Sequence, residues 1–314
     1  MTRTNLILLA VLVLQVVAFA FKTLAAPDAV DAGPRGLLLD GLSADAVEQL
    51  VIDEGGDAED AGVTLKKTGS GWVVSDRWDH PADGAKVDEL IRELAALEVA
   101  DVVSQTGLHD VELGVADDDF RKKVTLTGGG ERTLYLGTSG RGSSTHTRVA
   151  GEQRVVAVRD FSTWRVNARA DSWVQRTVVD VDPEAVTELT LAGAEGTVTL
   201  RQDGEAWLVN DGPANADEVD KLIKKAAKVT LSKVVGPASG TPEGAVLTVT
   251  VTTPERATTW RIAPSTEDGK FLVAVDGGAH LVEVGKWAVE PLIDATAESL
   301  AGAIPMEAPE APQE

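Results

Sequence analysis

The sequence contains one long pattern twice, and this internal repeat limits the possible folds more than any other feature. "VTLKKTGSGWVV" at 63–74 aligns with "VTLRQDGEAWLV" at 198–209, and "PADGAKVDELI" aligns with "PANADEVDKLI" further along each copy. Later, "RVVAVRDF" at 154–161 aligns with "HLVEVGKW" at 280–287. Each copy is long enough to be a domain. The sequence therefore predicts two similar domains in tandem.

Each copy has the same predicted secondary structure, in which short strands surround one helix. Runs with alternating apolar residues indicate strands. After Asp83 and Asn215, apolar residues recur at intervals of three and four, as on one face of a helix. Both residues are suitable N-caps, and Glu218 stands at the capping-box distance from Asn215. We therefore predict an α+β fold, in which each repeat is a mostly antiparallel sheet with one main covering helix. The predicted strands are at 48–53, 63–67, the run with Trp72, 122–127, 132–137, 145–150 and 154–158 in the first copy and at 187–192, 198–202, the run with Trp207, 246–251, 258–263, 271–275 and 280–284 in the second.

A tryptophan precedes the helix in both copies at the same place. We expect each indole to lie on the sheet face beneath the following helix, where it would pack against a Leu-Ile pair of that helix. The predicted core of the repeats consists of Trp72, Leu90, Ile91, Trp207, Leu222 and Ile223.

The apolar run "NLILLAVLVLQVVAFAF" at 5–21 is uncharged and lies between Arg3 and Lys22. As a helix it would reach about 26 Å, slightly less than a hydrocarbon core, and Lys22 can snorkel to make up the difference. The run predicts a retained transmembrane anchor, and a cleaved signal peptide is the alternative. In both cases the bulk of the chain lies outside the cytoplasm.

Composition shifts define the predicted boundaries. Residues 1–23 form the membrane segment and residues 24–40 a linker rich in Pro, Gly and Ala. The first repeat is expected at 41–178 and the second at 179–300. The acidic, proline-rich residues 301–314 are expected to be disordered.

Composition also excludes several functions. The net charge of -21 argues against binding to nucleic acid, which requires Lys and Arg to replace phosphate counterions. The chain has no Cys, which excludes disulfides, thiolate catalysis and a lipid-bearing N-terminal Cys.

No motif requires catalysis. The glycine-rich "GTSGRGSS" at 137–144 runs into another strand instead of opening a helix, so it predicts a hairpin and not a phosphate loop. The four histidines have no metal-ligand spacing and are expected at the surface or in loops. The acidic stretches at 116–120 and 180–184 lack a calcium-loop pattern. We therefore assign no catalytic, cofactor-binding or metal-binding residues, and expect that the protein is not an enzyme.

One region has the opposite charge to the rest of the chain. Residues 121–176 contain eleven Lys or Arg and four acidic residues. In "DFSTWRVNARADSWVQR" a helical arrangement would place Arg165, Arg169 and Arg176 away from the aromatic face of Phe161 and Trp164. These arginines could form a docking face for an acidic partner or an anionic envelope polymer. Alternatively, and in our preferred interpretation, they pair with the acidic second copy.

The combined pattern resembles a bacterial family, domain of unknown function 4340. The resemblance rests on the N-terminal anchor, the Gly-x-x-Trp strand, the "V-D-x-L-I" helix, the "Leu-Gly-Val" step at 113–115 and "Leu-Tyr-Leu-Gly" at 134–137. It covers about 45–300 in two copies, and the second copy lacks the "Leu-Gly-Val" step. The resemblance implies a membrane-anchored auxiliary protein of ABC-type export systems, including those linked to gliding motility. It implies no catalytic residues.

Two functions follow from these expectations. The first is a single-pass protein of the bacterial inner membrane with its bulk in the periplasm or outside the cytoplasm. It would be an interaction module and an accessory subunit of a transport or envelope complex, with integral-membrane or envelope proteins as partners. The second is a secreted or periplasmic protein that binds a ligand or polymer in the cleft between the repeats.

Overall fold

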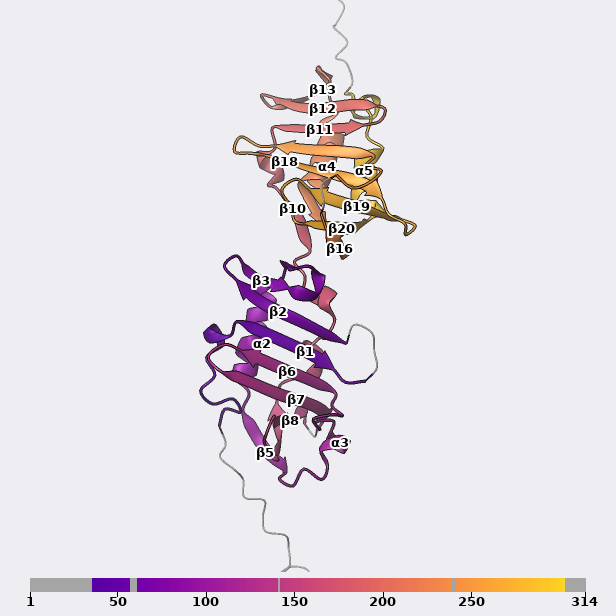
Figure 1. Ribbon diagram of the computed structural model, residues 1–314. Coiled ribbons are helices and arrows are strands. Elements are labelled where there is room, and N and C mark those ends of the chain that lie inside the picture. Colours follow the sequence, from indigo (N-terminus) through magenta and orange to yellow (C-terminus); the bar gives the residue numbers. More distant parts are fainter. Residues whose placement is uncertain (1–35, 57–60, 141, 239–240, 303–314) are drawn as a thin grey trace, which may run out of the picture. The chain divides into compact units, whose positions relative to one another are not determined.

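The computed structural model of the protein describes residues 36–56, 61–140, 142–238 and 241–302 (Figure 1). The predicted membrane segment, most of the predicted linker and the tail from residue 303 lie outside the described residues. Among the helices that are described, none is both long and apolar enough to cross a membrane.

Two nine-stranded sheets with the same strand order make up most of the structure (Figure 1). The first has the order β4-β3-β2-β1-β6-β7-β8-β9-β5, and the second has the order β14-β13-β12-β11-β17-β18-β19-β20-β16. The described strand pairs are antiparallel, which confirms the predicted α+β class. The strands of the first sheet are β1 (Gln49–Glu54), β2 (Gly62–Thr68), β3 (Gly71–Val74), β4 (His80–Pro81), β5 (Val99–Ser104), β6 (Lys122–Thr127), β7 (Glu131–Ser139), β8 (Ser144–Val149) and β9 (Val155–Arg159). Those of the second are β11 (Glu188–Gly193), β12 (Gly196–Asp203), β13 (Ala206–Val209), β14 (Gly212–Pro213), β16 (Lys233–Pro237), β17 (Leu247–Thr252), β18 (Ala257–Pro264), β19 (Lys270–Val275) and β20 (His280–Gly285).

The likeness of the two sheets extends to single side chains. Thr125 of β6 and Thr133 of β7 share a hydroxyl hydrogen bond of 3.1 Å. Thr250 of β17 and Thr259 of β18 share one of the same length at the equivalent place in the second sheet. Such cross-strand threonine pairs fix register, because a slip of one residue would turn them to the other face.

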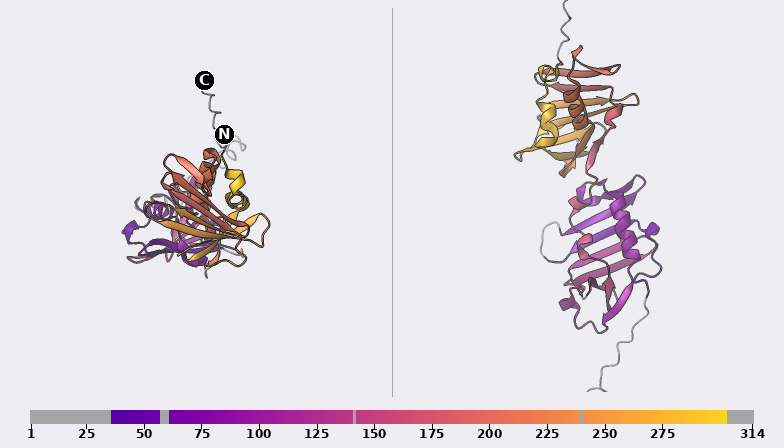
Figure 2. Two further views of the ribbon diagram at one scale, coloured as in Figure 1. Left: turned by 90° about the horizontal axis from the view of Figure 1, so that it is seen from above. Right: turned by 180° about the vertical axis from the view of Figure 1, so that it is seen from behind.

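One 12-residue helix follows the first hairpin of each sheet, as predicted. These helices, α2 (Gly84–Ala95) and α4 (Ala216–Ala227), lie across one face of their sheets (Figure 2). The side chain of Asp83 accepts from the Lys86 amide at 3.2 Å, and Asn215 caps α4 in the same way. The backbone amide of Asn215 donates to the Leu300 carbonyl, so the capping box predicted with Glu218 is not used at this end.

A second helix covers the second sheet beside α4, which the sequence did not predict. It is α5 (Lys286–Ile293), which begins directly after β20 and lies next to α4 (Figure 2). The short α6 (Ala297–Leu300) follows it. Ala301 then forms a bridge with Ala214, so the folded structure continues past the predicted boundary at residue 300.

The segment after β9 in the first sheet is not the helix that the sequence predicted. It contains two separate 3-10 turns, η3 (Thr163–Arg165) and η4 (Ala170–Ser172), and the residues between them are not helical. The predicted helical face that would carry Arg165, Arg169 and Arg176 therefore does not exist. Further 3-10 turns are η1 (Ala44–Ala46), η2 (Ser75–Arg77) and η5 (Pro183–Ala185).

Two chain segments lie across the predicted boundaries. Residues 36–40, assigned to the linker from sequence, belong to the fold, because Leu37 bridges Glu98 and the Leu39 side chain is buried. Strand β10 (Thr177–Asp180) spans the predicted junction between residues 178 and 179. It pairs with β15 (Lys228–Thr230) at the end of α4 in a two-stranded sheet.

The two repeat tryptophans align in the sequence but differ in how far they are buried. Trp72 has only 5% of its surface exposed, and its ring lies 3.7 Å from a Cβ built at Gly84, the first residue of α2. Trp207 is only half-buried, so the prediction that both are equivalent core residues needs correction. The first copy inserts η2 after β3, and this turn packs against β2. The helix residues Leu90, Ile91, Leu222 and Ile223 are all buried.

A buried arginine holds the crossing segment between β5 and β6 onto the first sheet. This segment includes α3 (Asp110–Leu113). Arg148 of β8 is 4% exposed, and its guanidinium donates to the Val115 carbonyl at 2.7 Å and to Asp117 at 2.6 Å. It also lies over the Tyr135 ring, 4.6 Å from the centroid, and 3.5 Å from Asp110. Hydrogen bonding to Arg148 lowers the pKa of the Asp117 carboxyl, and burial raises the pKa of Tyr135.

Candidate binding clefts in the two sheets

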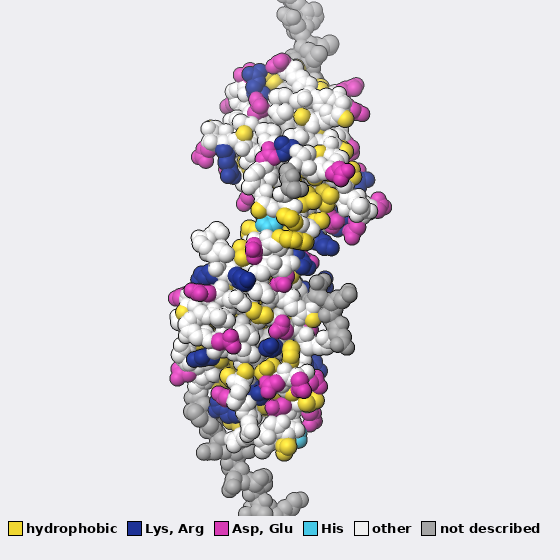
Figure 3. Space-filling model, in the orientation of Figure 1, with side chains coloured by type: hydrophobic (Ala, Val, Ile, Leu, Met, Phe, Trp, Pro, Cys, Tyr) yellow, Lys and Arg dark blue, Asp and Glu magenta, His cyan; other side chains and the backbone are white. Residues whose placement is uncertain are grey.

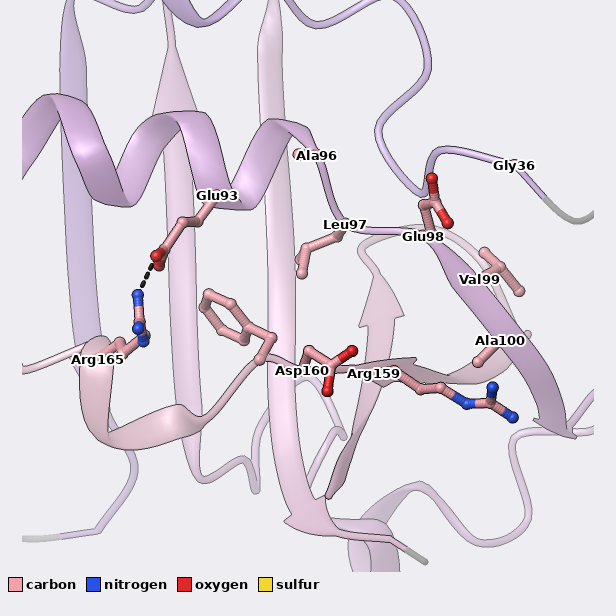
Figure 4. A pocket seen from close by; sticks show the side chains of 11 residues that line it. Gly36, Glu93, Ala96, Leu97, Glu98, Val99, Ala100, Arg159, Asp160 and Arg165 are labelled. Atoms are coloured by element: carbon pink, nitrogen blue, oxygen red, sulfur yellow. Dashed lines mark hydrogen bonds and ion pairs between the residues drawn. The ribbon is translucent and has the colours of Figure 1, made fainter. Parts of the chain in front are cut away.

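Each sheet has a cleft beside the end of its last long hairpin. The first cleft has a volume of about 820 Å³ and lies among the end of α2, the start of β5 and the residues that follow β9 (Figure 4). The second cleft has a volume of about 730 Å³ and lies among β15, the start of β19, the end of β20 and the start of α5. The first is lined by Gly36, Glu93, Ala96, Leu97, Glu98, Val99, Ala100, Arg159, Asp160, Phe161 and Arg165, and the second by Arg176, Thr230, Leu231, Ser232, Gly269, Lys270, Gly285, Lys286, Trp287 and Glu290.

The two clefts occupy equivalent positions in the two sheets. Arg159 pairs with Ser144 at the end of β9, and Gly285 pairs with Lys270 at the end of β20. Across each cleft the same backbone bond recurs, because the Val99 amide donates to the Gly36 carbonyl at 3.0 Å and the Leu231 amide donates to the Arg176 carbonyl at 2.8 Å. The fold therefore forms this cleft twice.

The first cleft is slightly acidic. Glu93 of α2 and Arg165 form an ion pair at one end, and Glu98 and Arg159 lie toward the other (Figure 4). Of its charged lining residues, three are acidic and two are basic. Phe161, with 4% exposure, contributes to the packed wall and offers little surface to a ligand.

The second cleft is basic and has an exposed aromatic ring. Arg176, Lys270 and Lys286 line it, with Glu290 as the one acidic lining residue. Lys270 pairs with the buried Glu283 at 3.2 Å, and Lys286 pairs with Glu290 at 2.8 Å, which raises the pKa of Lys286. Trp287, the counterpart of Phe161, is 66% exposed.

The direction of the chain after the last strand explains why these two aromatic residues differ. In the first sheet Asp160 has a left-handed conformation with φ of 57°, and Phe161 then turns inward. In the second sheet the chain enters α5 at once, and Ala288 and Val289 fill the core in place of the aromatic ring. Trp287 is therefore free to lie on the outside.

The three predicted docking arginines have different surroundings. Arg165 is paired with Glu93 in the first cleft, Arg176 lines the second cleft, and Arg169 lowers the pKa of Asp171, though less than Arg77 does. On the face drawn in Figure 3, acidic and basic side chains are interspersed. The ion pair of Arg165 is with α2 of its own sheet, which neither sequence interpretation had foreseen.

Reversing the charge of Arg165 tests how this ion pair contributes to stability. Both side chains are about one-third exposed, so we expect Arg165→Glu to lower the free energy of unfolding by about 1 kcal/mol. The exchanged pair Arg165→Glu with Glu93→Arg should restore most of this loss. Thermal or urea unfolding of the four proteins in a double-mutant cycle measures the coupling. If Arg165→Glu and the exchanged pair lost the same free energy of unfolding, the ion pair would not contribute to stability.

The histidines are distributed differently from the prediction. His80 is buried, with 5% exposure, which corrects its assignment to a surface or loop; burial lowers the pKa of its imidazole, as it does for His146. His109 is exposed beside Glu112. Within the described ranges, no group of three or more His, Asp or Glu side chains could hold a metal ion. The predicted hairpin at the glycine-rich loop is confirmed, because β7 and β8 pair on either side of it.

Sequence reasoning missed the second cleft. Its residues come from four separate elements, and the sequence alignment gave Trp287 the same role as Phe161. A signal was present, since Asp160 and Lys286 have opposite charges at aligned positions. This charge difference indicates a difference between two binding sites only once the structure shows that both residues line a cleft.

Comparison with known proteins identifies a family and no individual relative. No curated protein and no solved structure matches the chain. The sequence model described as "Domain of unknown function (DUF4340)" matches residues 72–246. This match begins in β3 of the first sheet and ends just before β17 of the second, so it includes parts of both sheets and more than half of the chain. The chain therefore belongs to the DUF4340 family.

Proposed function

We propose that the protein is a membrane-anchored extracytoplasmic interaction module and an accessory subunit of an ABC-type transport or cell-envelope complex. The observation that carries this proposal is the recurrence of one cleft at equivalent places in both sheets. A module that presents two similar clefts of different charge is suited to contacting two surfaces of a partner. The acidic net charge argues against nucleic acid as that partner.

The proposed location rests on the apolar residues 5–21 of the sequence. We propose that they anchor the chain in the bacterial inner membrane by a single pass, with the bulk in the periplasm or outside the cytoplasm. Extraction of the full-length protein should require detergent, and intact-mass measurement should find the N-terminus uncleaved. A mature protein that begins near residue 26 and is released by salt would contradict the anchor.

Affinity purification of the full-length protein in mild detergent tests the accessory role. We expect an ATPase or permease subunit to co-purify, and Arg159→Glu in the first cleft to reduce its recovery severalfold through charge reversal. Lys66→Glu, at an exposed position of β2 outside both clefts, is the matched control. Recovery of no such subunit would contradict the proposal, as would equal losses in both variants.

The exposed Trp287 in the second cleft favours one alternative, a protein that binds a ligand or an envelope polymer. In that case the purified protein should bind isolated envelope glycans without a partner subunit. Trp287→Ala should weaken this binding to glycans.

A further inference from the structure

The second cleft combines features that packing does not explain. Trp287 is 66% exposed although neighbouring residues already fill the core beneath it. Its indole lies over Gly285, where an added Cβ would approach the ring nitrogen to 2.6 Å. Lys225 of α4 places its ammonium over the same ring, 5.0 Å from the centroid. A tryptophan held in place yet open to solvent is a typical anchor of a binding surface.

The charge around this ring favours an anionic occupant. Arg176 is exposed in the cleft and forms no ion pair with any described residue. Lys225 likewise has no acidic partner within the described ranges, and its amine contacts only the Trp287 carbonyl, at 3.5 Å, besides the ring. The equivalent positions of the first cleft include Gly36 in place of Arg176 and Asp160 in place of Lys286. Since both clefts arise from one fold, the basic residues are not required to build it.

We propose that the acidic, proline-rich segment 303–314 of the same chain binds in this cleft. Its sequence, "AIPMEAPEAPQE", contains three glutamates and no basic residue. In a polyproline II helix, which has three residues per turn, Glu307 and Glu310 share one face, while Pro309 and Pro312 share another. Proline rings pack against exposed aromatic rings, and carboxylates pair with Arg and Lys, so the two faces match the two components of the cleft.

The end of the described chain lies within reach of the cleft. The Gly302 amide donates to the Pro213 carbonyl, and the Leu300 carbonyl accepts from Asn215, so this end lies at the start of α4. Lys225 is in the last turn of the same 12-residue helix, whose length is about 18 Å. Ten residues in a polyproline II conformation span about 31 Å. The segment is therefore long enough to return along α4.

A shallow hollow connects the two places. It has a volume of about 390 Å³ and lies between α4 and the α5–α6 segment. Leu300 and Ser299 line it near the end of the described chain, and Lys225 lines it near Trp287. Its other charged lining residues are Glu218 and Lys221, which pair at 2.8 Å, and Asp294. The segment would follow this hollow from Gly302 toward Trp287.

Competition between the segment and an added peptide tests the inference. The probe is a fluorescently labelled peptide of residues 303–314, and anisotropy measures its binding to the full chain. A tethered segment competes at an effective concentration of about 1 mM, so the unmodified chain should bind the peptide weakly. The chain with E307Q, E310Q and E314Q should bind it at least tenfold more tightly, and added salt should weaken this binding.

Two further variants of the glutamine-substituted chain locate the binding site. Trp287→Ala should weaken peptide binding at least tenfold, and its exposed position should leave the melting temperature nearly unchanged. Trp164→Ala is the matched control, because Trp164 of η3 is 72% exposed and lies outside both clefts. Equal binding by the unmodified and glutamine-substituted chains would overturn the inference, as would an effect of Trp164→Ala equal to that of Trp287→Ala. The inference does not depend on the proposed function, since no membrane partner takes part in the assay.

Discussion

Replacing Trp72 with alanine is expected to lower the free energy of unfolding by about 3 to 5 kcal/mol, one of the two largest losses we expect from a single substitution here. The indole is 5% exposed and lies against the first turn of α2. Removing it leaves a cavity that the surrounding strands can fill only in part. Urea unfolding followed by circular dichroism measures the loss.

The matched control is the same change at Trp207. This residue aligns with Trp72 in the sequence but is only half-buried. Because less apolar surface leaves water when it folds, we expect Trp207→Ala to cost about 1 to 2 kcal/mol. Equal losses at the two sites would contradict the view that burial, and not the sequence motif, determines the contribution of each tryptophan.

Substitution of Arg148 by alanine should cost a similar amount, about 3 to 5 kcal/mol, for an electrostatic reason. Its buried guanidinium satisfies the Val115 and Glu152 carbonyls and lies between the carboxylates of Asp110 and Asp117. Without it, the mostly buried Asp110 loses its compensating charge, and the Val115 carbonyl loses its donor. We expect the crossing segment that contains α3 to detach first, which hydrogen exchange at its amides would detect.

Arg148→Lys tests whether the stability contributed by Arg148 depends on its positive charge alone or also on the directions of its hydrogen bonds. A lysine keeps the positive charge but cannot reach several acceptors in fixed directions, so we expect it to recover less than half of the lost stability. Full recovery by lysine would show that charge alone matters at this position.

The Arg148 contact should also make the stability of this segment depend on pH. Arg148 lowers the pKa of Asp117 below its usual value in the folded protein. The contribution of the pair is therefore complete above the unfolded pKa of about 4 and is lost as pH falls through the lower folded pKa. Asp117 is largely exposed, so the effect should be small. Asp117→Asn should remove this acid dependence, as measured by unfolding at pH 2 to 5.

The sequence predicted those features that depend on local periodicity. The alternation of apolar residues identified the long strands, and the spacing of Val219, Leu222 and Ile223 identified α4 because that helix buries one face. Asp83 and Asn215 were identified as N-caps because their side-chain oxygens accept hydrogen bonds from backbone amides two or three residues further along the chain. These signals lie within a few residues of one another.

The basic segment at 160–176 shows where periodicity fails. Its aromatic and arginine residues have helical spacing, yet the chain forms two short 3-10 turns there. Phe161 and Trp173 are buried, and residues distant in sequence contact them: the Thr145 hydroxyl donates to the Phe161 carbonyl, and Lys86 lies over the Trp173 ring. Such tertiary contacts outweigh the local preference. Spacing alone contains no information on such distant partners.

The sequence by itself determined that the chain carries one α+β pattern twice and belongs to the DUF4340 family, because repeated residues and packing patterns can be read without coordinates. Only the tertiary structure decided that each sheet forms a cleft, that the second cleft is basic, and that Trp287 lies outside while Phe161 is buried. The physical reason is that a cleft is a relation among separate elements. The exposure of an aromatic ring depends on the direction in which the backbone leaves the preceding strand and on which other side chains already fill the core.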